Sequence, residues 1–325
     1  MRVLHSIAEL STAPGPVFLA IGVFDGVHLG HRAVIERALS DAKAANGTAV
    51  VVTFDPHPMR LMRPEKAPRL LTSTQHKAAL IARLGVSHLL ITPFTRELSA
   101  TTPEDFVLSL HQACRPLREI CVGTSWTFGK DKAGNVALLS KMGAELGFEA
   151  VGIPAVLIDG EVVSSTRVRA GVRAGELEQV KRLLGRDFSI LGTVKHGDHL
   201  GRTLGFPTAN LSAHNEKFPP NGVYAVEAIY GGRTLGGVVN IGVRPTIHAE
   251  GGERVLELHL FDFDENLYGR DVEVVFHKFL RPEQKFPGLD ALKAQIARDV
   301  VEARSVLEKK EPRAKNAKVA KKRAL

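Results

Sequence analysis

Short apolar runs alternate with helix-like segments along the first half of the chain. Val17–Val23 and Thr48–Phe54 are apolar or β-branched runs, a pattern typical of parallel strands buried on both faces. Between them, His31–Ala45 repeats apolar residues at helical spacing, and Gly47 is placed to end that helix. A further helix is predicted at Gln75–Leu84, and further strands at His88–Thr92 and Ile120–Gly123. This alternation predicts a doubly wound parallel sheet that binds ligands at the carboxyl ends of its strands.

The pattern changes in the second half, where short strands are separated by Gly and Pro. The candidates are Ile190–Lys195, Val223–Ile229, Thr234–Ile241, Val255–Phe261 and Val272–Phe279. Such strands favour a barrel or a sandwich. A helix is predicted at Leu177–Leu184, before this region, and an amphipathic helix at Leu289–Leu307, at its end. We therefore predict an N-terminal domain over residues 1–185, a C-terminal domain over 186–308 and a basic disordered tail over 309–325.

The position of the charge changes how the composition is interpreted. The 325 residues carry a formal net charge of +8, which raises the question of nucleic-acid binding. The tail 309–325 holds eight Lys or Arg and one Glu, so the remaining chain is almost neutral. A disordered solubilising tail is the favoured interpretation, with a nucleic-acid-binding tail as the alternative. No nucleic-acid partner is therefore expected for the folded body.

Cysteine content and hydropathy indicate the compartment. Two cysteines do not make a disulfide framework, and no apolar run reaches the roughly 18 residues of a membrane helix. We expect a cytoplasmic protein with no membrane partner. We also expect a monomer or a weak homo-oligomer.

The first chemical motif runs from Gly22 to His31, between the first strand and the first helix. His28 and His31 lie at the predicted helix N-terminus, where backbone N–H groups and the helix dipole favour anions. Imidazoles there can stabilise charge that builds on an α-phosphate during displacement. The predicted ATP-binding positions in this motif are Gly22, Asp25, Gly26 and Gly30. The alternatives are a zinc site and a helix cap with incidental histidines.

A second polar segment, Ser164, Ser165, Thr166 and Arg167, precedes another predicted helix start. Hydroxyl and guanidinium groups suit a triphosphate, although a Ser-Ser-Thr cap alone is common. Together with the histidine motif, this segment resembles the nucleotidyltransferase superfamily, which joins a nucleotide to an acceptor and releases pyrophosphate. The resemblance implies that His28 and His31 are catalytic and that residues 164–167 bind ATP.

Two segments that follow strands, Thr53–Pro58 and Val122–Lys130, resemble the prokaryotic FAD synthetase family. The resemblance implies an apolar slot for the flavin ring of FMN; ordinary core at a strand end is the alternative. The residues assigned to flavin are Phe54, Pro56, His57, Pro58, Trp126 and Phe128. The family usually has Asp or Asn followed by Phe where this chain has Ser125 and Trp126. Because of that departure, an alternative hypothesis is an enzyme with kinase activity only, in which the N-terminal domain is a regulatory nucleotide binder.

The strongest motif of the second half is Gly192–Leu211, whose Gly-Phe-Pro-Thr-Ala-Asn segment resembles the riboflavin kinase domain. Its glycines suit a loop whose amides wrap around phosphates. We assign ATP binding to Gly197, Gly201, Arg202 and Gly205, and flavin binding to Phe206. The resemblance implies that Thr208 and Asn210 hold Mg²⁺ and ATP, since neutral oxygen ligands fit a Mg²⁺ ion that keeps water and phosphate oxygens. A Pro-Thr turn followed by an Asn bend is the alternative.

Alternation along Val255–Leu260 puts three leucines on one strand face and Glu257 on the other. A solvated strand face is the common interpretation of a lone Glu. In the family, however, the matching Glu takes the proton from the ribityl 5′-hydroxyl as that hydroxyl attacks the γ-phosphate, which is general base catalysis. Arg281, in the segment before the last helix, is assigned to the flavin site.

These matches run in order from Val17 to Asp299 and resemble the family of bifunctional riboflavin kinase/FMN adenylyltransferases. The resemblance implies a Rossmann-like α/β nucleotidyltransferase domain with a parallel sheet, followed by a mainly-β six-stranded barrel. It implies riboflavin, FMN and ATP as small-molecule substrates, ATP as the co-substrate of both reactions, and Mg²⁺ as cofactor.

Overall fold

The computed structural model describes residues 1–195, 205–244 and 253–309. It divides into two compact units, Met1–Arg169 with Arg182–Gly185, and Ala170–Lys181 with Arg186–Leu325. Three predicted phosphate-binding residues, Gly197, Gly201 and Arg202, lie outside the described residues, as does the tail after Lys309. The predicted domain limits at residues 185 and 308 stay predictions.

The first unit is built on a parallel six-stranded sheet. Its strands, in spatial order, are β1 (Arg2–Leu4), β4 (His88–Pro93), β3 (Thr48–Asp55), β2 (Val17–Ile21), β5 (Leu117–Gly123) and β6 (Glu149–Ile153). Every adjacent pair in this order is parallel. The predicted parallel α/β fold is thus confirmed.

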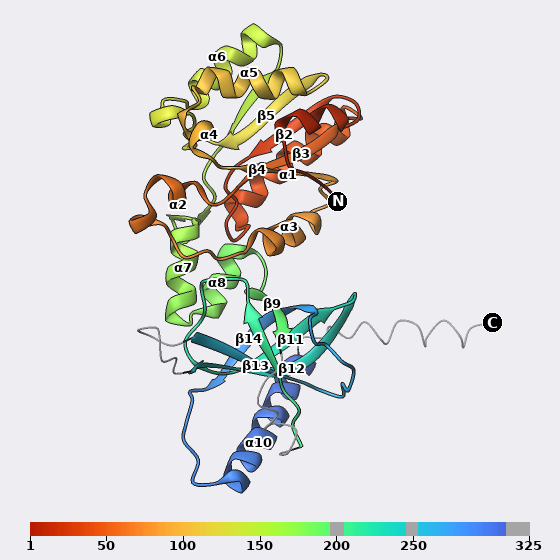
Figure 1. Cartoon of the computed structure of the whole chain (residues 1–325), viewed down its shortest axis with the longest axis vertical. Coiled ribbons are helices and arrows are strands. Elements are labelled where there is room, and N and C mark those ends of the chain that lie inside the picture. Colours follow the sequence, from red (N-terminus) through yellow and green to blue (C-terminus); the bar gives the residue numbers. More distant parts are fainter. Residues whose placement is uncertain (196–204, 245–252, 310–325) are drawn as a thin grey trace, which may run out of the picture. The chain divides into compact units, whose positions relative to one another are not determined.

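Helices cover both faces of this sheet (Figure 1). On β2, Phe18 and Ala20 pack toward the helices α1 (Leu29–Ala44) and α3 (Thr74–Ala82). Leu19 and Ile21 face the other layer, which contains α5 (Pro103–Ala113) and α6 (Val136–Leu146). Because both faces are covered, the central strands β2 and β3 are apolar or β-branched along almost their whole length, which explains the two runs in the sequence.

The order of the strands fixes where a ligand can enter the first unit. From β2 the chain moves to β3 and β4 on one side, whereas β5 and β6 lie on the other. The connections therefore reverse direction between β2 and β5, and such a switch point leaves a crevice at the carboxyl ends of the strands. The segments after β2 and β5 are the ones that carry the histidine and the Trp126 motifs.

Shorter elements complete the first unit and lead into the second. They are the helices α2 (Pro58–Met62), α4 (Arg96–Ala100), α7 (Ser165–Ala174) and α8 (Leu177–Leu184), the hairpin strands β7 (Leu157–Ile158) and β8 (Glu161–Val162), and the 3₁₀ segments Ile7–Thr12, Pro64–Lys66 and Lys130–Lys132.

The second unit contains a closed antiparallel barrel, as predicted. Around the barrel the strands are β10 (Ala209–Ala213), β13 (Glu253–Leu260), β12 (Arg233–Arg244), β11 (Gly222–Tyr230), β14 (Asp271–Arg281) and β9 (Ser189–Lys195). Five of these overlap strands expected from the pattern of the sequence. The sixth, β10, was not expected from that pattern, although the family resemblance implies six strands.

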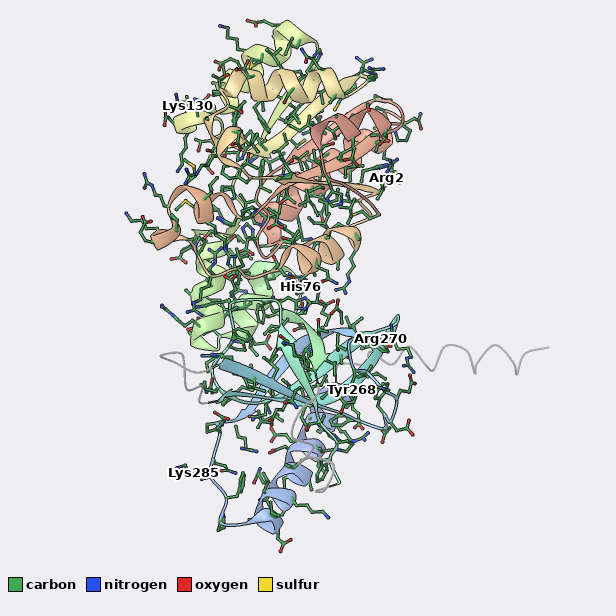
Figure 2. The ribbon with its side chains drawn as sticks, viewed as in Figure 1. Arg2, His76, Lys130, Tyr268, Arg270 and Lys285 are labelled. Atoms are coloured by element: carbon green, nitrogen blue, oxygen red, sulfur yellow. The ribbon has the colours of Figure 1, made fainter. Side chains whose placement is uncertain are left out.

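In the barrel, the leucines of β13 are fully or almost fully buried. The same holds for Tyr224 and Val226 of β11. The last helix, α10 (Leu289–Glu308), packs against β11, β12 and β14. Ala303 of α10 lies in a core cluster with Val223 and Val238. Figure 2 shows Lys285 on the long connection between β14 and α10. Among the described residues, no helix is long and apolar enough to cross a membrane.

Candidate active sites

A cavity of about 910 Å³ lies at the switch point of the first unit. Its walls come from the segments after β2, β3 and β5 and from the residues before α7. Twelve of the predicted site residues line it: Gly22, His28, Gly30, His31, Phe54, His57, Pro58, Trp126, Phe128, Ser164, Ser165 and Thr166. The structure thus brings together four segments that are distant in the sequence.

The loop from Gly22 to His28 is shaped by unusual backbone angles. Phe24, Gly26 and Val27 all have positive φ, at 53°, 82° and 43°. Such angles are costly for non-glycine residues and are concentrated at functional sites. A Cβ on Gly22 would lie 2.8 Å from the Phe24 ring. Glycine is therefore required at residue 22 for the ring to pack where it does.

The two histidines stack on each other at the start of α1. His28 is the N-cap, and its Nδ1 accepts a hydrogen bond from the backbone N–H of His31 at 3.3 Å. The ring centroids are 3.5 Å apart, with 19° between the ring planes. Nδ1 of His31 is buried and has no hydrogen-bond partner in the described part of the chain. His28 therefore caps α1, and both histidines also line the cavity; their catalytic role stays a prediction.

His31 is held in its neutral form. Burial, the largest cause, lowers the pKa of His31 well below its ordinary value, and the nearby His28, Lys77 and Arg169 lower it further. Desolvation and like charges both disfavour the imidazolium. An anion in the cavity would act in the opposite direction. His31 is thus suited to gain a proton or donate a hydrogen bond when negative charge arrives.

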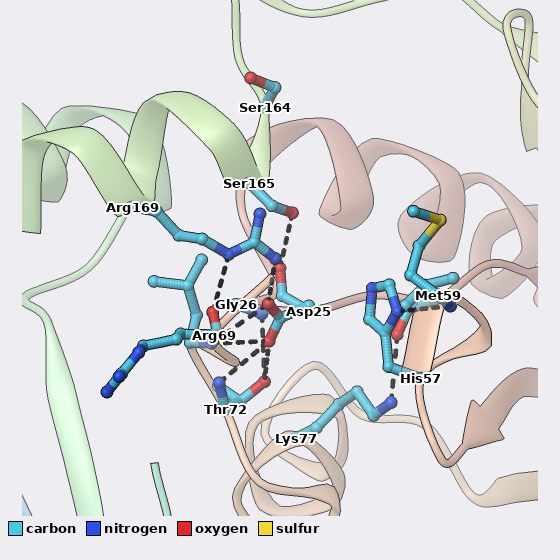
Figure 3. A network of polar contacts seen from close by, with 12 residues as sticks. Asp25, Gly26, His57, Met59, Arg69, Thr72, Lys77, Ser164, Ser165 and Arg169 are labelled. Atoms are coloured by element: carbon cyan, nitrogen blue, oxygen red, sulfur yellow. Dashed lines mark hydrogen bonds and ion pairs between the residues drawn. The ribbon is translucent and has the colours of Figure 1, made fainter. Parts of the chain in front are cut away.

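Asp25 does not line the cavity but organises the segments around it (Figure 3). Its carboxylate accepts hydrogen bonds from the backbone N–H of Leu71 at 3.0 Å and of Thr72 at 3.0 Å. It also accepts a bond from Nη2 of Arg169 at 2.6 Å, and its backbone carbonyl accepts one from Oγ of Ser165 at 2.9 Å. Its predicted contact with ATP stays a prediction, and its observed partners are protein groups.

The two arginines at the start of α7 have different partners. Arg167 donates to the carbonyl of Glu161 at 3.0 Å and lies 3.2 Å from the carboxylate of the same residue, so it holds the β7–β8 hairpin. Arg169 bonds Asp25 and the carbonyl of Arg69. Neither arginine lines the cavity, and neither do the predicted residues Gly26 and Pro56.

Aromatic side chains form one wall of the cavity. The Trp126 and Phe128 rings are stacked, with centroids 4.4 Å apart, and Phe54 meets Phe94 edge-on at 5.9 Å. His57 caps α2, with its Nδ1 accepting from the backbone N–H of Met59 at 3.1 Å. Burial is the main cause that lowers the pKa of His57. The nearly parallel Trp126 and Phe128 rings give this wall an apolar surface that suits a planar ring system.

Several charged residues at this site were not singled out from the sequence. Arg63 and Lys132 line the cavity, whereas Arg169 and Lys77 lie behind its wall. For Arg169, the available signal was its position on the same predicted helix start as Arg167. For Lys77, it was a spacing of three and four residues from Leu80 and Ile81, which puts it on the buried face of α3.

In the barrel, three polar residues lie side by side on adjacent strands, and two of them, Glu257 and Asn210, were predicted site residues. Glu257 on β13 pairs with Asn210 on β10 and with Asn240 on β12. Directly opposed residues in antiparallel pairs present their side chains on the same face, here the face opposite to the buried Leu256 and Leu258. Oδ1 of Asn210 is buried with no hydrogen-bond partner in residues 1–195, 205–244 and 253–309.

The segment before β10 lies against β13. The backbone carbonyl of Pro207 is 2.9 Å from Nδ1 of His259, and the Phe206 ring meets the His259 ring edge-on at 5.5 Å. Gly205 has a φ of 82°, and Thr208 is exposed. The motif residues Gly205, Phe206, Thr208 and Asn210 therefore approach the strand that carries Glu257.

Arg281 is engaged with the last helix. Its guanidinium binds the buried carboxylate of Asp299 at 2.8 to 3.0 Å and lies 5.7 Å from the centroid of the Phe286 ring. It thus fixes the connection between β14 and α10, and its predicted contact with flavin stays a prediction.

Comparisons with known proteins match one family to each half of the chain. The family described as FAD synthetase matches residues 11–167, and the family described as riboflavin kinase matches residues 184–307. A bifunctional riboflavin kinase/FMN adenylyltransferase from Escherichia coli (strain K12) is 41% identical over 306 residues, covering 94% of this chain and 97% of its own. The chain belongs to this family. A bifunctional riboflavin kinase/FMN adenylyltransferase from Pseudomonas fluorescens is 40% identical, with coverage of 94% and 98%.

A solved structure that is described as a macrolide-efflux protein from Streptococcus pneumoniae is similar to most of this chain. The TM-score is 0.78 and the sequence identity 26%, with coverage of 94% of this chain and 99% of that chain. The two family matches also divide the predicted residues between them, those up to Arg167 in the first and those from Gly197 to Arg281 in the second. Arg169 lies just beyond the FAD synthetase match.

Proposed function

We propose that the chain makes FAD from riboflavin in two steps. The second unit transfers the γ-phosphoryl group of ATP to riboflavin and forms FMN. The first unit then transfers AMP from a second ATP to FMN, forming FAD and pyrophosphate. The observation that carries the proposal is the cavity that joins the capped N-terminus of α1 to an aromatic wall. One cavity thus offers both an anion site and a slot for a planar ring.

In the adenylyl transfer, an oxygen of the FMN phosphate attacks the α-phosphorus of ATP. The new P–O bond forms as the bond to the bridging oxygen breaks, and pyrophosphate leaves. His28, His31 and the first N–H groups of α1 stabilise the charge that develops on the α-phosphate. The ATP-binding positions are assigned to Gly22, Gly26 and Gly30 and to the segment from Ser164 to Arg167, with Asp25 as the residue that holds these segments together. No covalent enzyme intermediate is needed, because positioning and charge neutralisation dominate such reactions.

The flavin ring of FMN occupies the aromatic wall. Phe54 and the stacked pair Trp126 and Phe128 supply flat apolar surface, and Pro56, His57 and Pro58 close the slot on the side of α2. Ser125, which lines the same cavity, supplies a hydroxyl where the family usually has a carboxylate or an amide.

In the phosphoryl transfer, Glu257 accepts the proton of the ribityl 5′-hydroxyl as this oxygen attacks the γ-phosphorus and ADP leaves. Phe206 and Arg281 belong to the riboflavin site, and Gly197, Gly201, Arg202 and Gly205 to the ATP site. The buried Oδ1 of Asn210, which has no hydrogen-bond partner among the described residues, suits a cation, and Thr208 and Asn210 would hold Mg²⁺ there. Bound Mg²⁺ neutralises phosphate charge.

The direct test uses purified chain and two separate incubations. With riboflavin, ATP and Mg²⁺, chromatography should show FMN followed by FAD. With FMN, ATP and Mg²⁺, it should show FAD and pyrophosphate. FMN from the first incubation and no FAD from the second would favour a kinase with a regulatory first unit, the alternative that Ser125 keeps open. Omitting Mg²⁺ in the presence of a chelator should stop FMN formation.

A further inference from the structure

A lysine is buried behind the cavity wall of the first unit. Lys77 projects from α3, and only 6% of its surface is exposed. Lysines are almost never buried without partners, because removing an ammonium from water is costly. That cost is visible here, since burial lowers the pKa of Lys77 to about 8 against the opposing effect of Asp25 and Asp55. At neutral pH Lys77 is still largely protonated. The fold thus keeps a positive charge buried behind the cavity wall, although this burial costs free energy.

The ammonium bridges two strand ends. Nζ of Lys77 donates to the backbone carbonyl of Val23 at 3.1 Å and to Oγ1 of Thr53 at 2.9 Å. Thr53 in turn donates to the same carbonyl of Val23 at 3.0 Å. Val23 follows β2 and lies in the cavity wall, in the loop that leads to His28. Thr53 is the buried neighbour of Phe54, which lies in the flavin wall.

We propose that Lys77 is a positioning residue for adenylyl transfer: its buried ammonium locks the ends of β2 and β3 together, and with them the phosphate-binding and the flavin-binding walls of the cavity. This proposal rests on the proposed function of the first unit. Lys77 touches neither substrate in this account. It acts through Val23 and Thr53, and through the positive potential that it adds behind a site for anions.

The electrostatic part of this role has a measurable consequence. Lys77 is among the charges that lower the pKa of both His31 and His57. The other charged or titratable groups acting on His31 are His28 and Arg169, and those on His57 are Asp25, Arg169 and Arg60. Removing the ammonium should therefore raise the pKa of His31 toward its ordinary value. A neutral structural bridge would not affect that pKa.

The experiment uses the full chain and two variants that separate the bridge from the charge. Lys77→Met removes both, whereas Thr53→Val removes the two hydrogen bonds of the Thr53 hydroxyl and keeps the charge. Lys43→Met, at an exposed position on α1, is the matched control. For each protein we would measure kcat and KM for FMN adenylylation, riboflavin phosphorylation on the same preparation, the thermal unfolding midpoint, and the pKa of His31 by NMR.

For Lys77→Met we expect kcat of adenylylation to fall by about tenfold or more, with phosphorylation within about twofold and a raised His31 pKa. For Thr53→Val we expect a loss of a few fold and an almost unchanged His31 pKa. Wild-type adenylylation in Lys77→Met, or an unchanged His31 pKa, would overturn the proposal. If Lys77→Met does not fold, full activity in Thr53→Val overturns it. If wild type makes no FAD, the proposed function fails and the role of Lys77 in adenylyl transfer fails with it, whereas a raised His31 pKa in Lys77→Met would still show that the ammonium acts on this cavity.

Discussion

Replacing Asp25 by Asn should disable the first unit and leave the second intact. The Asp25 carboxylate receives donors from Leu71, Thr72 and Arg169. An Asn side chain at residue 25 must direct an NH₂ group at one of these donors and removes the charge opposite Arg169. The Asp25 and Arg169 side chains are 5% and 17% exposed. Breaking a buried ion pair by removing one partner costs about 3–5 kcal/mol. Because Arg169 retains some access to water, we expect the lower end, about 3 kcal/mol.

The composition of the chain offers a selective probe for this loss. The protein has one tryptophan, Trp126, which lies in the first unit. Urea titration followed by tryptophan fluorescence therefore reports unfolding of that unit, and the midpoint should fall in Asp25→Asn with little change in slope. FMN adenylylation should fall strongly, since the Asp25 carboxylate also holds the loop before α3 through the backbone N–H groups of Leu71 and Thr72. Riboflavin phosphorylation should stay within about twofold.

A double-mutant cycle tests the cause of the loss. With Arg169→Met as the second change, the coupling energy between Asp25 and Arg169 should reach about 2 kcal/mol, because the two side chains share one ion pair. A destabilisation below about 1 kcal/mol in Asp25→Asn, together with unchanged adenylylation, would refute the view that this carboxylate organises the site.

Three further changes probe other parts of the first unit. Burial raises the pKa of Glu119 from 4.5 to about 7, so the stability due to its protonated form is present below pH 4.5 and lost as pH rises through 7. Glu119→Gln should therefore be close to wild type at pH 4 and exceed its unfolding free energy by a few kcal/mol at pH 8; an equal difference in urea titrations at both pH values would contradict this. Arg167→Met should free the β7–β8 hairpin, so limited proteolysis within residues 157–162 should quicken by about threefold or more, and an unchanged cutting rate would argue against the clamp. Gly22→Ala places a Cβ 2.8 Å from the Phe24 ring, which packs edge-on against His31 at 5.4 Å, so adenylylation should drop about tenfold with phosphorylation preserved; equal loss of both activities would point to general unfolding.

Sequence patterns predicted the parallel sheet and most of the barrel because strands that are buried on one or both faces have a regular pattern of apolar residues. The strand β10 lacks such a pattern. Ala209–Ala213 contains one large apolar residue, Leu211, and reads as a loop. It is a strand because β9 and β13 pair with it on both sides. Pairing between distant segments leaves no local signal in the sequence.

In the candidate site too, local features were predictable from the sequence, whereas contacts between distant segments were not. The histidine pair was predictable because a helix start after a strand is a local feature. The partners of Arg167 and Arg169 were not predictable, since two residues apart on a helix means opposite sides, and only the fold shows which side meets Asp25 and which meets the hairpin. Lys77 was overlooked because a lysine is ordinarily assigned to a solvated face. Its role depends on Val23 in the loop after β2 and on Thr53 in β3, which are distant from α3 in the sequence.

The central claim is that one chain carries two independent sites that act in sequence. The most direct measurement supplies riboflavin, ATP and Mg²⁺ to two folded variants, Glu257→Gln and His31→Ala, first separately and then mixed. Alone, Glu257→Gln should form neither FMN nor FAD from riboflavin, and His31→Ala should accumulate FMN. The mixture should form FAD, because FMN released by one variant is adenylylated by the other. Folded His31→Ala that forms no FMN, or a mixture that forms no FAD while FMN accumulates, would contradict the account.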